Sequence, residues 1–150
     1  MDTMQLVIFK LSNQDYGIDI FNVNEIVPYS MPTKIPNSPE YIEGILNLRG
    51  KVIPVISLKK KFNMADNNAD DRTRIIVANT GGSTAGFVVD EASEVLTIDK
   101  ANIEPVTDVV SHINHKYIDG VGKLDNGRMF ILLNFNEIYS EDTVHTSAKA

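Results

Sequence analysis

The residue types that most often carry chemistry are sparse in this 150-residue chain. His112 and His115 have a spacing found in metal sites, but a zinc site needs three or four converging ligands and the chain has no cysteine to complete one. Asp66, Asp70 and Asp71 lack the alternating acids, central glycine and terminal glutamate of a calcium loop. The sequence therefore indicates polar loops at both places and predicts no metal site.

Nucleophilic and phosphate-binding chemistry has no sequence support either. The lack of cysteine excludes disulfides and a thiol nucleophile, and no serine stands in a nucleophile-elbow pattern. Gly81-Gly82 precedes a strand-like run rather than a helix, so it predicts a hairpin turn and not a phosphate cradle. We predict a non-catalytic protein without a cofactor. The alternative is a small β-barrel ligand-binding protein or enzyme, which a deep apolar pocket with converging polar groups would favour.

The charge distribution disfavours a nucleic-acid partner. Residues 1–75 hold nine acids and nine bases, whereas residues 76–150 hold eleven acids and five bases, so the net charge of −6 lies wholly in the second half. A nucleic-acid surface needs a basic footprint. The basic run Lys59-Lys60-Lys61 is typical of a solvated face at the end of a strand.

The first residues and the length of the apolar runs indicate where in the cell the protein is expected. Residues 1–5 contain no basic region that would begin a signal peptide. The longest apolar runs are about five residues, while a membrane helix needs about 20. These features predict a soluble, cytoplasmic protein without direct membrane insertion.

An internal repeat organises the elements. Isoleucine and valine total 31 against 9 leucines, a balance that favours strands. Three segments recur in the same order at spacings of 69 to 77 residues. The matched pairs are residues 17–27 with 86–96, 41–45 with 117–121, and 52–56 with 129–133. Two similar halves of short strands follow from this layout.

The short strands of each half predict a small closed barrel, because closure removes the exposed edges that a short open sheet would have. We expect an all-β fold of two tandem five-stranded subdomains with short helical connections. The first subdomain spans about 4–66 and the second about 72–140, and a polar tail follows at 141–150. Arg49-Gly50 predicts a tight hairpin turn between two strands of the first half.

Several of these segments resemble the CheW coupling proteins of bacterial chemotaxis. The resembling segments are Tyr16 to Ile20, Val23, Glu25-Ile26, Gly44 to Gly50, Val52 to Val55 and Gly86 to Asp90. The likeness runs from about Gln5 to Tyr139 as a single CheW-like domain, and it implies two SH3-like barrels. It also implies an adaptor that binds the regulatory domain of the histidine kinase CheA and the cytoplasmic tip of methyl-accepting chemoreceptors, and a location at receptor arrays on the inner face of the membrane.

The resemblance and the strand pattern together predict a set of partner-binding residues. Its members are Val23, Glu25, Gly44, Leu46, Asn47, Leu48, Arg49, Gly50, Val88 and Val89. Successive strand residues point to opposite faces, so Val88 and Val89 cannot share one interior. One of them should face outward or into a groove between the barrels, where the resemblance implies that the receptor binds.

The second half serves as a comparison for Arg49. Its equivalent there is Asp125, whereas Glu25 keeps a counterpart in Glu94. If the fold itself required an Arg–Glu pair, both halves should retain it, so we predict that Arg49 serves binding. Pro54 lacks a backbone donor, which predicts an edge or bulge position where a partner barrel docks.

Overall fold

The computed structural model describes residues 2–65, 68–105, 115–124 and 127–139. His112, Asp66, Asp125 and the tail at 141–150 lie outside the described residues. The described elements are β1 (Thr3–Leu11), β2 (Gln14–Asp19), η1 (Ile20–Asn22), β3 (Val23–Pro28), β4 (Ile42–Leu48), β5 (Lys51–Ser57), α1 (Leu58–Lys61), β6 (Arg74–Thr80), β7 (Ser83–Val89), β8 (Glu91–Asp99), η2 (Lys100–Asn102), β9 (Ile103–Glu104), η3 (His115–Tyr117), β10 (Ile118–Lys123) and β11 (Met129–Leu133). A short helix follows at 135–139.

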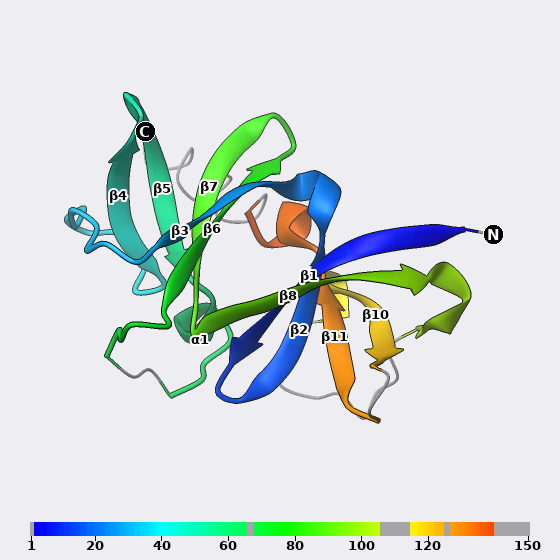
Figure 1. Cartoon of the computed structure of the whole chain (residues 1–150). Coiled ribbons are helices and arrows are strands. Elements are labelled where there is room, and N and C mark those ends of the chain that lie inside the picture. The colour runs from blue at the N-terminus through cyan, green and yellow to red at the C-terminus, as the bar shows by residue number, and fades with distance from the viewer. Residues whose placement is uncertain (1, 66–67, 106–114, 125–126, 140–150) are drawn as a thin grey trace.

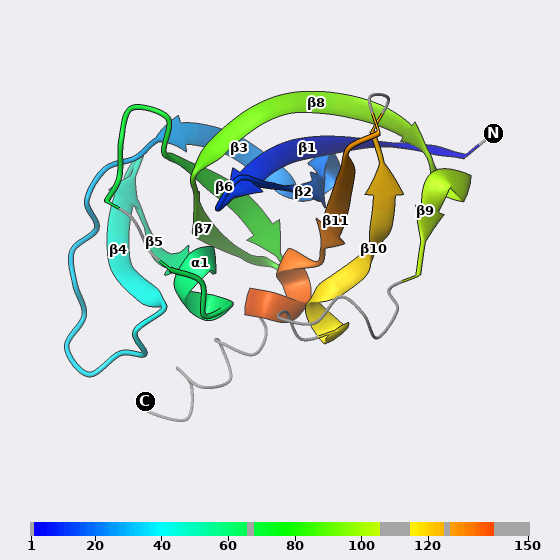
Figure 2. The same ribbon diagram turned by 90° about the horizontal axis from the view of Figure 1, so that it is seen from below.

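The strands form two sheets, and the all-β prediction is confirmed. One sheet has six strands in the order β8-β1-β2-β11-β10-β9, and the other has five in the order β3-β6-β7-β5-β4. The two sheets lie beside each other, and α1 sits between them on one side of the molecule (Figures 1 and 2). The count in the second sheet matches the expectation, while the short β9 adds a sixth strand to the other.

The division of the chain between the sheets differs from the expected boundaries. The hairpin β1–β2 does not join β3, β4 and β5 but pairs with β8 and β11 of the second half. The hairpin β6–β7 in turn joins β3 and β5 of the first half. Contiguous subdomains at 4–66 and 72–140 therefore need correction, because each half gives its first hairpin to the sheet of the other. The repeat has the same strand pattern in both halves, so pattern alone does not distinguish pairing within a half from pairing between halves.

The repeat itself is visible in matching backbone details. Gly17 of β2 lies opposite Leu132 of β11, and Gly86 of β7 lies opposite Val55 of β5, both in parallel ladders. The carbonyl of Tyr41 accepts from the Ser57 amide at 2.7 Å, and the carbonyl of Tyr117 accepts from the Asn134 amide at 2.8 Å. Register shifts also recur at 42/44 and 118/120, and at the β3–β6 and β1–β8 ladders.

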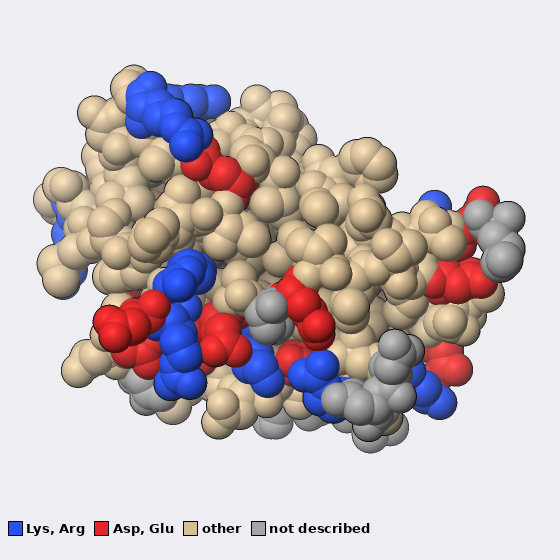
Figure 3. Space-filling view, in the orientation of Figure 1, with Lys and Arg blue, Asp and Glu red and all other residues tan. Residues whose placement is uncertain are grey.

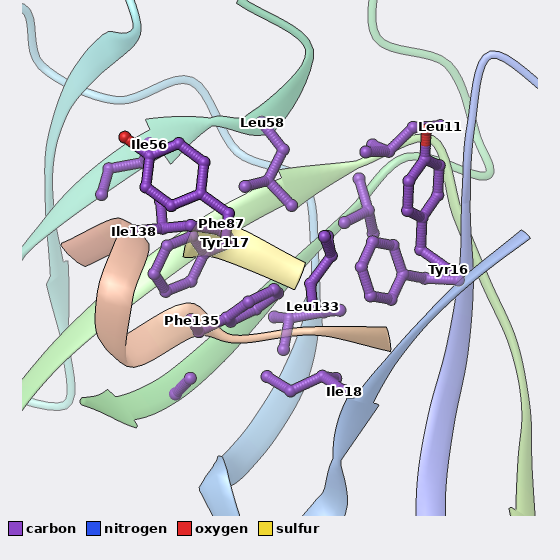
Figure 4. Packing of buried hydrophobic residues seen from close by; sticks show 14 of the residues in the cluster. Leu11, Tyr16, Ile18, Ile56, Leu58, Phe87, Tyr117, Leu133, Phe135 and Ile138 are labelled. Carbon is purple, nitrogen blue, oxygen red and sulfur yellow. The ribbon is translucent and has the colours of Figure 1, made fainter. Parts of the chain in front are cut away.

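A cluster of buried side chains joins the two sheets. We call it the central cluster, and it combines residues of β1 and β2 with residues of β5, β6 and β7 and of the helix at 135–139. Phe135 is fully buried beside Phe87 (Figure 4). Its ring centroid lies 4.2 Å from that of Phe87 and 6.0 Å from that of Phe9. Smaller clusters fill the inner face of the six-stranded sheet around Phe130 and of the five-stranded sheet around Ile53.

Replacing Phe135 should destabilise both sheets together. Truncation to alanine removes a buried ring that contacts one strand from each sheet, so Phe135→Ala should lower the free energy of unfolding by about 3–5 kcal/mol. Phe21 is 88% exposed, and Phe21→Ala is the matched control that should change stability by less than about 0.5 kcal/mol. Urea unfolding measures both, and equal effects of the two variants would contradict the packing described.

Candidate partner-binding site

The turn between β4 and β5 sets the geometry of the candidate site. Both central residues have left-handed backbone, with φ of 53° at Arg49 and 83° at Gly50. Two consecutive positive φ values define the type I′ hairpin turn, which glycine and asparagine adopt most readily. The side-chain oxygen of Asn47 accepts from the Gly50 amide at 3.0 Å and fixes the turn. The hairpin prediction is confirmed, and it places an arginine at an unfavourable backbone angle.

The Arg49 guanidinium forms an ion pair with the Glu25 carboxylate of β3. β3 and β4 are the two end strands of the five-stranded sheet, so the sheet curls until its ends are joined by this pair. The Arg49 side chain is 76% exposed and the Glu25 side chain 22%. Figure 3 shows basic surface at the tip of the β4–β5 hairpin, with acidic surface beside it and uncharged surface beyond.

The second half also has an Arg–Glu pair, which corrects the comparison made from the sequence. Arg128 donates to Glu94 at 3.2 Å and to Asp15 at 3.2 Å. By register Arg128 corresponds to Lys51, not to Arg49, and Lys51 donates to Thr84 in the first half. The second half does lack an arginine at the position matched to Arg49, but its glutamate pairs with an arginine at the position matched to Lys51. The conclusion that the second half has no Arg–Glu pair is therefore wrong.

The predicted residues divide between the surface and the interior. Glu25, Asn47, Arg49 and Gly50 gather at the hairpin tip. The apolar residues do not gather there: Leu46, Leu48 and Val88 pack against the cluster around Ile53, and Val23 packs against the central cluster. Val88 and Val89 do point to different interiors, but Val89 is fully buried in the central cluster. We therefore assign Val89 to packing rather than to contact with a partner.

Gly44 is buried and has a packing role. Its φ is +144°, and a Cβ built there would lie 2.1 Å from the backbone oxygen of Thr33. Thr33 exchanges two backbone hydrogen bonds with Ile45, so the segment before β4 crosses directly over Gly44. The glycine is required by this close approach.

Pro54 does not mark a sheet edge. Its strand, β5, lies between β7 and β4, which contradicts the expected edge position. The ladder between β5 and β7 begins one residue later, at Val55. The missing backbone donor is tolerated because Pro54 precedes the ladder that would have used it.

Three exposed apolar residues near the site were missed in the sequence. Val52 is 60% exposed beside the hairpin tip, Ile26 is 37% exposed on β3, and Phe21 is 88% exposed in η1. Strand alternation offers a signal for Ile26, because Val23, Glu25 and Val27 share the opposite and less exposed face of β3. No comparable signal marks Phe21.

Other polar features of the described residues give little basis for cofactor chemistry. Among residues 2–65, 68–105, 115–124 and 127–139, no group of three or more His, Asp or Glu side chains is placed to hold a metal ion. A polar cleft of about 410 Å³ is lined by residues including Lys10, Asp70, Arg72 and Asp90. A hollow of about 220 Å³ with a mixed charged and apolar lining lies between β8 and the end of β10. Gly81-Gly82 forms the predicted turn, with φ of 64° and 91°.

Comparison with known proteins identifies the family. The model of the CheW-like domain matches residues 5–143. The chain belongs to the CheW-like domain family. It is 38% identical over 138 residues to the chemotaxis protein CheW of Klebsiella aerogenes, covering 92% of this chain and 82% of that protein. It is 34% identical over 141 residues to CheW of Helicobacter pylori, covering 94% and 84%.

A solved structure of a family member has the same fold. The scaffolding protein TtCheW from Thermoanaerobacter tengcongensis superposes with a TM-score of 0.82 at 42% identity, covering 89% of this chain and 86% of that one. The chain thus belongs to a family of chemotaxis scaffolds rather than enzymes. Within the described part of the chain, no helix has the length and apolar character needed to span a bilayer.

Two glycines of the site should respond differently to alanine. In Gly44→Ala the new methyl group would clash with the backbone of Thr33, so the two segments must move apart. In Gly50→Ala the methyl group lies in open space, and the only cost is that of alanine in left-handed backbone, roughly 1–2 kcal/mol. Gly44→Ala should therefore be the more destabilising change in thermal or urea unfolding. An equal or smaller loss at Gly44 would show that the crossing segment does not depend on this close approach.

Proposed function

We propose that this chain is a non-catalytic adaptor that couples chemoreceptors to the histidine kinase CheA. Family membership supports a chemotaxis scaffold, and a scaffold acts by holding partners together. The observation that carries the finer proposal is Arg49, a largely exposed cation held in a fixed orientation by Glu25 at a turn where the backbone disfavours arginine.

The fold alone gives no reason for an arginine at this turn. Left-handed backbone costs a non-glycine residue roughly 1–2 kcal/mol. A surface ion pair returns about 0–1 kcal/mol, which does not exceed that cost. The other type I′ turns of the described chain use Ser12-Asn13 and Gly81-Gly82, in which asparagine or glycine occupies at least one of the two left-handed positions. Arginine is enriched at protein interfaces because its planar fork and stem suit them, so we assign Arg49 to partner binding.

We propose that the two partners use different surfaces. The cytoplasmic tip of a receptor, a helical hairpin by family resemblance, docks beside Arg49, Glu25 and Asn47 and along β3 toward Val23. The regulatory domain of the kinase docks on the outer surface of the five-stranded sheet, barrel against barrel. Binding both partners raises their effective concentration for each other without new chemistry. This role places the chain in the cytoplasm at receptor arrays. It requires neither nucleic acid nor membrane insertion, in keeping with the net charge of −6.

Arg49→Ala should separate binding from stability. The free energy of unfolding should change by less than about 1 kcal/mol, because the ion pair lies at the surface. Affinity for a receptor-tip fragment should fall about thirtyfold, the equivalent of 2 kcal/mol for a desolvated interface arginine, and affinity for the kinase regulatory domain should fall less. Urea unfolding and calorimetric titration against the two fragments provide the measurements.

Arg128→Ala is the matched control in the other half. Arg128 pairs with Asp15, whose side chain is only 7% exposed, so its removal should cost about 1–3 kcal/mol of stability. Receptor affinity of the folded variant should stay at the wild-type value. Normal receptor binding by Arg49→Ala, or equal binding losses for both arginines, would defeat the assignment of the β4–β5 turn to the receptor.

A further inference from the structure

The hairpin β1–β2 completes the six-stranded sheet by pairing with strands that lie far from it in the sequence. Its strands pair with β8 and β11, which follow it by more than 70 residues in the sequence. Chain continuity joins it to the rest of the molecule only through η1, the three residues Ile20–Asn22. The sheet therefore recognises the hairpin by its ladders and its buried side chains, and it does not require that the hairpin belong to the same chain.

We propose that this chain self-associates by reciprocal exchange of the hairpin Thr3–Asp19 with a second copy of itself. In the exchanged dimer each hairpin completes the six-stranded sheet of the other copy. Every β1–β8 and β2–β11 pair keeps its register, and each central cluster keeps the same side chains, including Phe9 and Ile18. An identical chain is the partner that supplies this hairpin with all of these contacts unchanged.

The connection at η1 has the properties of a hinge for such an exchange. Three residues span at most about 10 Å when extended, so the two copies must meet closely at their hinges. Phe21 sits in the middle of this connection and is 88% exposed, more than any other large hydrophobic residue of the described chain. In the dimer the two crossing hinges bring both Phe21 rings into the junction, which removes their apolar surface from water.

The corresponding connection on the other side is not a hinge. β7 continues into β8 through Asp90 alone, and its carboxylate accepts from the Ser12 amide at 2.7 Å. The same carboxylate pairs with Lys59, whose side chain is 5% exposed, at 3.2 Å. The pair with Lys59 is partly buried and ties the β7–β8 crossing to α1, so exchange involves the β1–β2 hairpin and not β6–β7.

Concentration during folding decides between the two forms. The short tether gives the hairpin an effective concentration of about millimolar for its own sheet, so the monomer dominates when folding occurs at micromolar concentrations. Once folded, release of the hairpin breaks two ladders and opens the central cluster. Exchange after folding is therefore slow, and the dimer persists when it is diluted.

Paired cysteines distinguish the exchanged dimer from a surface dimer, since the natural chain has no cysteine. Gln5 and Thr97 are exposed and face each other across β1 and β8, so the double variant Gln5→Cys with Thr97→Cys tests which chain supplies the hairpin. Asn79→Cys with Thr84→Cys is the control, because these paired positions lie within one hairpin. Both variants are refolded at about micromolar and about millimolar concentration, oxidised, sized and run on denaturing gels without reductant.

The proposal expects a dimer fraction that rises with refolding concentration and survives dilution. In that fraction the 5–97 disulfide joins two chains, while the 79–84 disulfide stays within one. Phe21→Ser should lower the dimer fraction by about tenfold or more. Wild-type protein refolded at both concentrations and then diluted provides a test without cysteines. A monomer under all conditions, a dimer that dissociates on dilution within seconds, or a dimer with 5–97 disulfides only within chains would overturn the proposal.

Discussion

Pairing between the first hairpin of one half and the later strands of the other holds this molecule together. The ladder between β1 and β8 runs over eight residue pairs, from Thr3↔Asp99 to Lys10↔Glu91. It joins the two halves of the repeat inside one sheet, and the β3–β6 ladder does the same in the other. The central cluster, with Phe135 between Phe9 and Phe87, then joins the two sheets to each other. Neither half can complete a sheet without the other.

Although the two sheets are related by the repeat, their arginine–glutamate pairs lie in different surroundings. Each sheet has an arginine–glutamate pair beside a hairpin turn: Arg128 with Glu94 in the six-stranded sheet and Arg49 with Glu25 in the five-stranded sheet. In the six-stranded sheet Arg128 also reaches the buried carboxylate of Asp15, which ties it to the fold. In the five-stranded sheet Arg49 contacts Glu25 and stays mostly exposed. The two arginines therefore differ in exposure, 41% for the Arg128 side chain and 76% for the Arg49 side chain.

The sequence predicted the strands, the repeat and the turns, because these follow from local patterns such as Arg49-Gly50 and Gly81-Gly82. It did not predict that each half contributes its first hairpin to the sheet of the other half. The two halves have the same strand pattern, and such strands pair equally well within a half or between halves. It placed Glu25 and Arg49 together through family resemblance. Alternation correctly placed Val88 and Val89 on opposite faces of β7, but it did not show that Val89 would be fully buried. Arg128 was also missed, because this arginine corresponds to Lys51 and lies three residues beyond Asp125, the position matched to Arg49.

We expect the two sheets to form one cooperative unit, because each half of the chain contributes its first hairpin to the sheet of the other half. Native-state hydrogen exchange in increasing urea tests this most directly. The account predicts that the slowest amides of β1 and β11 in one sheet and of β6 and β7 in the other share a single free energy of opening and a single urea dependence, both equal to those of global unfolding. The contradictory result is a set of amides in one sheet that opens well below the global free energy while the other sheet stays protected.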